Sequence, residues 1–199
     1  MIDTDEALQR LLAGNRRFAA GDHAGAPIQD QVRRPDLSAG QSPFAVVLGC
    51  SDSRAPVEIL FDQRPGDLFV VRVAGNIARP TQIGSIEFAV NQLGVRLVVV
   101  LGHSDCGAVR ATLEHQRRPK PMTPGLCEII ETISPAIESV ADHGSVDDAI
   151  WANVEAVVAV LHRADGLRDE VGRGALQIVG ARYEIETGCV EFAPGLAVG

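Results

Sequence analysis

The stretch FAVVLGCSDSR at residues 44–54 and the stretch LVVVLGHSDCG at residues 97–107 decide the expected fold. Each begins with an apolar run of strand length and ends in a polar cluster. Short apolar runs that alternate with helical patterns are typical of a parallel sheet with helices on both faces. Ligands of such sheets bind at the carboxyl ends of the strands, so we expect the two clusters to lie together.

The same alternation continues on both sides of these stretches. Further strands are predicted at 68–73, 175–181 and 189–192, and helices at 56–61, 81–93, 106–116, 124–141 and 145–164. Glycine, proline and polar clusters separate these segments, as expected for turns. The predicted fold is therefore α/β, with a mostly parallel central sheet, an antiparallel edge strand and helices on both faces. One domain is expected to span residues 1–199.

The N-terminal segment predicts an amphipathic helix from Asp3 to about Phe18, which Asp3 can cap. Residues 21–43 are rich in Gly, Pro, Asp and Gln and predict an irregular connection. A helix followed by such a connection is poorly placed to bury its apolar stripe within one domain. We therefore expect residues 1–40 to form an N-terminal helical arm that packs on a partner subunit.

Composition excludes several classes of partner. The 199 residues carry a formal net charge of -8, without a long block of like charge. A nucleic acid or an anionic membrane would need a basic patch, so neither is expected as a partner. We expect no leader, and no apolar run approaches the ~20 residues of a spanning helix. We expect a cytoplasmic protein, in which clustered Cys and His residues bind a metal rather than form disulfides.

Two thiols and an imidazole follow the two central strands, from Cys50, His103 and Cys106. Three soft ligands of this kind suit Zn²⁺, and three protein ligands leave a fourth position open, as in catalytic zinc sites. Asp52 and Arg54 come directly after Cys50. They predict either a solvated surface ion pair or a functional pair beside the metal.

The motifs CSDSR at 50–54 and HSDCG at 103–107 resemble those of the β-class carbonic anhydrases. The similarity extends to LAGNRRF at 12–18, GDLFVVRVAGN at 66–76, GSIEFAV at 84–90 and YEIETG at 183–188. The resemblance implies that Cys50, His103 and Cys106 bind zinc, with Arg54 holding Asp52 ionised so that it orients the zinc-bound hydroxide. It also implies that Asp52 becomes a fourth zinc ligand in a closed, inactive state.

The resemblance further implies substrate contacts. Gln41 matches a glutamine that donates to a substrate oxygen in the plant-like branch of the family. Phe69, Ala74 and Phe88 would form the small apolar pocket that a nonpolar gas requires. Val47 stands where another branch, which binds bicarbonate at an inhibitory site, carries a Trp. The plant-like branch with an open zinc site is therefore favoured.

The activity implied is the reversible hydration of carbon dioxide to bicarbonate and a proton, by a homodimer or a homotetramer. Two alternatives stay open. Relatives that hydrolyse carbonyl sulfide or carbon disulfide keep the same ligands and the same Asp-Arg pair. A non-catalytic zinc protein would instead hold Asp52 permanently as the fourth ligand, although Arg54 is placed to keep it away.

Overall fold

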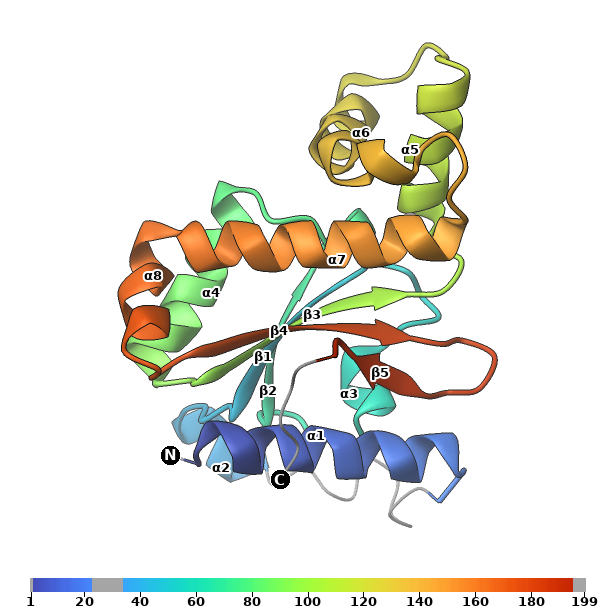
Figure 1. Cartoon of the computed structure of the whole chain (residues 1–199). Coiled ribbons are helices and arrows are strands. Elements are labelled where there is room, and N and C mark those ends of the chain that lie inside the picture. The colour runs from blue at the N-terminus through green and yellow to red at the C-terminus, as the bar shows by residue number, and fades with distance from the viewer. Residues whose placement is uncertain (1, 23–33, 195–199) are drawn as a thin grey trace.

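The computed structural model describes residues 2–22 and 34–194. They form a five-stranded sheet with helices around it (Figure 1). The strand order is β2-β1-β3-β4-β5. The strands are β1 (Ala45–Gly49), β2 (Leu68–Arg72), β3 (Leu97–His103), β4 (Gln177–Tyr183) and β5 (Val190–Phe192). The first four are parallel and β5 pairs antiparallel with β4. The predicted α/β fold with an antiparallel edge strand is confirmed.

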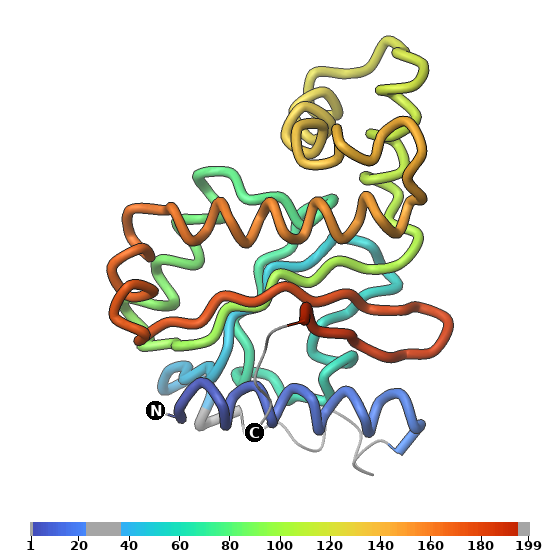
Figure 2. Tube along the Cα trace, viewed as in Figure 1, coloured from blue at the N-terminus to red at the C-terminus, as the bar shows by residue number. Residues whose placement is uncertain are grey.

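Helices cover both faces of the sheet. The helices are α1 (Thr4–Ala19), α2 (Arg34–Ala39), α3 (Val57–Leu60), α4 (Pro80–Leu93), α5 (Gly107–Arg117), α6 (Pro124–Ile137), α7 (Val146–Arg163) and α8 (Asp165–Gly172), with 3-10 turns η2 (Ala74–Asn76) and η3 (Glu138–Val140). Figure 2 shows α7 along one face and α1 along the other. Helices α4 and α8 share the core with α7, and α3 shares the core with α1. No helix within the described ranges is long and apolar enough to cross a membrane.

Helix α1 packs on the sheet of its own chain. The side chain of Asp3 caps it by accepting a hydrogen bond from the Glu6 N–H at 2.7 Å. Ala7, Leu8 and Leu11 are buried in one core cluster with residues of β1, β3 and β4. The apolar stripe is therefore buried within its own chain, where the four-residue helix α3 is too short to cover this face of the sheet alone. Packing of residues 1–40 on a partner subunit stays a prediction.

Other differences from the predicted elements are local. Helix α2 lies within the segment predicted to be irregular, of which residues 23–33 fall outside the described part. Helix α8 was not predicted, because its sequence has two glycines and little periodicity; burial of Leu167 anchors it. The start of α7 agrees with prediction, since Ser145 forms a capping box with Asp148.

Candidate metal centre

Strands β1 and β3 lie side by side in parallel, so the loops that follow them meet at one edge of the sheet. Cys50 follows β1, His103 ends β3, and Cys106 is the N-cap of α5. Their ligand atoms all lie within 4.8 Å of one another, and all three residues are buried. The structure thus brings together the three residues that the sequence predicts as metal ligands.

The ring of His103 is oriented to bind through Nε2. Its Nδ1 lies 2.9 Å from the carbonyl oxygen of Ser104, which accepts no bond unless Nδ1 carries the proton. The lone pair therefore remains on Nε2, which is buried and has no hydrogen-bond partner among the described residues. An unsatisfied buried nitrogen is unfavourable, and a metal ion would satisfy it.

Contact between the two thiols shifts their pKa values in opposite directions. The thiol of Cys106 donates to Cys50 and lowers the pKa of Cys50 to about 4, against the opposing effect of burial. The same contact raises the pKa of Cys106. A divalent cation between the sulfurs would allow both to ionise. Two thiolates and one imidazole nitrogen fit Zn²⁺ and leave one position for a ligand from outside the protein.

A turn after β2 contributes a backbone donor to Cys50. The Gly75 N–H donates to Cys50 Sγ at 3.3 Å. Gly75 has a φ of 71°, and a Cβ at this position would lie 2.7 Å from Ile133. Only glycine meets both conditions, so this residue lets the backbone approach the sulfur.

Asp52 and Arg54 form a bidentate ion pair beside the cluster. Arg54 Nε donates to Asp52 Oδ1 at 2.9 Å and Arg54 Nη2 donates to Oδ2 at 2.8 Å. This hydrogen bonding, to which the Arg54 N–H adds, holds the pKa of Asp52 well below its usual range. Asp52 Oδ2 lies 3.9 Å from His103 Nε2. An ionised carboxylate therefore faces the metal ligands.

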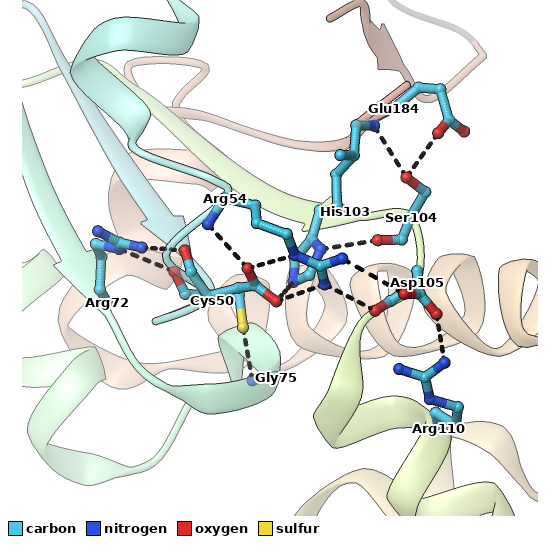
Figure 3. Close-up of polar contacts among 11 residues, drawn as sticks. Cys50, Arg54, Arg72, Gly75, His103, Ser104, Asp105, Arg110 and Glu184 are labelled. Atoms are coloured by element: carbon cyan, nitrogen blue, oxygen red, sulfur yellow. Dashed lines mark hydrogen bonds and ion pairs between the residues drawn. The ribbon is translucent and has the colours of Figure 1, made fainter. Parts of the chain in front are cut away.

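Arg54 also contacts the loop after β3. Its side chain lies at the centre of the polar network in Figure 3. Its Nη2 donates to the carbonyl oxygen of Asp105 at 3.3 Å and its Nη1 lies 3.4 Å from Asp105 Oδ2. Arg110 donates to Asp105 Oδ1 at 2.6 Å. Sequence reasoning assigned no role to Asp105 or Arg110. No local pattern indicated this contact, because the two residues are five positions apart, outside the i,i+3 and i,i+4 spacings of helical neighbours.

A second arginine, Arg72, binds the loop after β1. Arg72 Nε donates to the carbonyl oxygen of Cys50 at 2.8 Å, and Arg72 Nη2 donates to that of Asp52 at 2.6 Å. These bonds satisfy two carbonyl groups that have left the strand ladder. The loop that carries Cys50 and Asp52 is therefore held by two long, charged side chains.

Three of the predicted substrate contacts lie away from the cluster within one chain. Gln41 is exposed and precedes β1, whereas Cys50 follows it, and five strand residues span about 16 Å. Phe69 pairs in register with Val46 near the start of β1. Its ring contacts that of Phe88, with the centroids 6.3 Å apart. The fourth predicted contact, Ala74, lies in η2 beside the cluster.

The sequence matches the family described as Carbonic anhydrase over residues 45–190, which include both loops of the cluster. Carbonic anhydrase 2 of Mycobacterium tuberculosis is 40% identical over 185 residues, covering 92% of this chain and 89% of that protein. A carbonic anhydrase of Mycolicibacterium smegmatis is 42% identical over 189 residues, covering 94% and 91%. Both similarities extend over nearly the whole chain.

Solved structures of similar fold lead to the same group of proteins. One of two tetrameric beta-carbonic anhydrases from Sordaria macrospora superposes with a TM-score of 0.73 and is 26% identical, covering 95% of this chain and 98% of that chain. A Coccomyxa beta-carbonic anhydrase in complex with acetazolamide gives a TM-score of 0.72 at 28% identity, covering 93% and 85%. The fold, the metal-ligand cluster and the sequence therefore indicate the same protein family.

Proposed function

This chain belongs to the β-class carbonic anhydrases, and we propose that it catalyses the reversible hydration of carbon dioxide to bicarbonate and a proton with Zn²⁺ as its cofactor. The observation that carries the proposal is the buried cluster of Cys50, His103 and Cys106, in which His103 Nε2 has no hydrogen-bond partner among the described residues. These three residues would hold the zinc ion. When bound, zinc would supply a water nucleophile that is activated above neutral pH, because two thiolates offset the charge of the ion.

Asp52 would orient the attacking water. Its carboxylate is ionised and is held by Arg54 beside the metal ligands, so it can only accept a hydrogen bond there. An acceptor in this place fixes the proton of the water and leaves its lone pair directed at the substrate carbon. In a closed, inactive state the same carboxylate would bind the metal as a fourth ligand.

Gln41, Phe69 and Phe88 would contact the substrate of a second copy of the chain, and Ala74 the substrate of its own. Within one chain the first three are separated from the cluster by most of the length of β1. Phe88 is 49% exposed, and β2 lies at the edge of the sheet. An apolar side chain beside an edge strand suits a subunit contact. The proposed assembly is a homodimer or a homotetramer.

The proposed location is the cytoplasm. All four cysteines are free thiols in the structure, including the half-buried Cys127 and the exposed Cys189. Thiols persist in a reducing compartment. The two thiols of the cluster need that condition, because oxidation would remove them as metal ligands.

The test is stopped-flow hydration of carbon dioxide at alkaline pH, on protein whose zinc content is confirmed at one ion per chain. We expect rapid turnover that falls by about 100-fold or more in Asp52→Asn, because the acceptor that orients the water is lost. Asp169→Asn on α8 is the matched control and should keep full turnover, since Asp169 is exposed and remote from the site. Zinc-loaded protein without turnover would contradict the proposal, and carbonyl sulfide would then be tested as the substrate.

A further inference from the structure

The turn that joins β4 to β5, residues 184–189, contacts the loop after β3 through Ser104 (Figure 3). The Ser104 hydroxyl donates to Glu184 Oε1 at 2.7 Å and accepts from the Ile185 N–H at 3.0 Å. The Ser104 N–H donates to the Tyr183 carbonyl oxygen at 2.8 Å. Three hydrogen bonds therefore tie this one residue to the end of β4 and the turn that follows it.

The remaining polar group of Ser104 is its carbonyl oxygen, which accepts from His103 Nδ1 at 2.9 Å. This bond sets both the tautomer of the imidazole and the direction of Nε2. The bonds of the Ser104 hydroxyl and N–H fix the Cα and Cβ atoms from which this carbonyl extends, so they limit how far the carbonyl can move from His103 Nδ1. Asp105, the next residue, has a φ of 56°, so the backbone between His103 and Cys106 is further restricted.

Glu184 is itself held in place. Its Oε2 lies 3.6 Å from Arg182 Nη2, and its backbone is bonded across the turn to Gly188 and Cys189. The hydrogen bond from Ser104 lowers the pKa of Glu184, which keeps the acceptor charged. A charged acceptor makes the bond to the hydroxyl stronger than a neutral one would.

Helix α1 anchors the far end of the same turn. The buried side chain of Asn15 donates to the Gly188 carbonyl oxygen at 2.9 Å and accepts from the Val190 N–H at 2.8 Å. It also donates to the Leu60 carbonyl oxygen at 3.1 Å. The turn is therefore a rigid support, although it begins 80 residues further along the chain than Ser104.

We propose that Glu184 and Ser104 are positioning residues that hold His103 with its Nδ1 protonated and its Nε2 directed at the metal. The inference rests on the proposed metal centre, because it assigns a role toward a ligand of that centre. Both residues act through the Ser104 carbonyl and touch neither metal nor substrate. Loss of an outer partner of a metal-binding histidine typically weakens metal binding by about 10–100-fold.

The test measures the Kd for zinc by competition with a chelator. We expect Glu184→Ala and Ser104→Ala each to weaken zinc binding by about 10–100-fold. The double variant should bind no more weakly than Ser104→Ala alone, because both changes remove the same hydrogen bond. Glu184→Gln keeps a carbonyl acceptor for the hydroxyl and should restore binding close to the parent. Glu186→Ala, two residues away on the same turn, is the matched control and should leave the Kd unchanged.

A second readout follows the imidazole directly. Long-range ¹H–¹⁵N spectra of the zinc-free protein should show His103 as the Nδ1–H tautomer in the parent and in Glu184→Gln, and as a mixture in Glu184→Ala. Unchanged zinc binding and an unchanged tautomer in folded Glu184→Ala would overturn the inference while leaving the metal centre intact. Failure of the parent to bind one zinc ion per chain would overturn the metal centre as well. Should Ser104→Ala not fold, the comparison of Glu184→Ala with Glu184→Gln decides the test alone.

Discussion

The two loops of the metal-ligand cluster are held in different ways. The loop after β1, which carries Cys50 and Asp52, is fixed by the long side chains of Arg54 and Arg72, and the side chain of Arg54 is 45% exposed. The loop after β3, which carries His103 and Cys106, is fixed by short bonds of the buried Ser104. An arginine contact can exchange partners in water, whereas a buried hydroxyl bonded to backbone cannot. We infer that the loop after β1 can change its state and that the loop after β3, the rigid loop, keeps His103 and Cys106 in place.

The largest expected effect comes from removing a ligand of the rigid loop. His103→Ala should lose both zinc and carbon dioxide hydration, because only two thiols remain and neither can replace a nitrogen ligand at that position. Metal analysis and stopped-flow kinetics measure the two losses. His143→Ala is the control, since His143 is exposed and lies in the turn before α7. Retention of zinc with full turnover in His103→Ala would show that the cluster is not the metal centre.

The next effect separates the functions of the two loops. Arg54→Ala should keep its zinc and lose about 100-fold in turnover, because Asp52 is no longer held beside the ligands. Without Arg54 the pKa of Asp52 returns toward the ordinary value of about 3.9, so Asp52 stays ionised at neutral pH. The loss would therefore report a change of position, not of charge. Turnover equal to that of the control Arg168→Ala, an exposed arginine on α8, would contradict this assignment.

A smaller effect tests the turn between β4 and β5, which supports the rigid loop and which Asn15 anchors. Asn15→Ala removes three hydrogen bonds to the carbonyl oxygens of Leu60 and Gly188 and the N–H of Val190. We expect the free energy of unfolding to fall by about 1–3 kcal/mol, since buried backbone groups lose their partner. Denaturant titration measures this change, and the Kd for zinc should rise less than in Glu184→Ala. Asn91→Ala on α4, whose side chain makes one exposed hydrogen bond, should leave stability nearly unchanged.

The metal ligands could be predicted from the sequence because they depend on adjacent strands alone. Two apolar runs that pair in parallel bring their carboxyl ends together whatever surrounds them. The same reasoning applies to Gln41. It precedes the strand that Cys50 follows, so the strand itself separates the two residues. Its distance from the cluster within one chain was therefore predictable from the sequence.

The support of the rigid loop could not be predicted in this way. The bond between Ser104 and Glu184 joins residues 80 positions apart and depends on the register in which His103 pairs with Tyr183. No local pattern specifies that register. Packing of α1 on its own sheet was likewise hidden, because periodicity identifies an apolar stripe but not the surface that covers it.

The smallest expected effect concerns the bridge between the two loops. Asp105 binds Arg54 from one loop and Arg110 from α5, but all three side chains are about half exposed. Exposed ion pairs contribute little, so Asp105→Asn should lower turnover by less than about fivefold. Asparagine also tolerates the positive φ of 56° at this position, which separates the loss of charge from backbone strain. If turnover in Asp105→Asn instead fell as far as in Arg54→Ala, the loops would act as one unit, and the distinction between a movable and a rigid loop would be wrong.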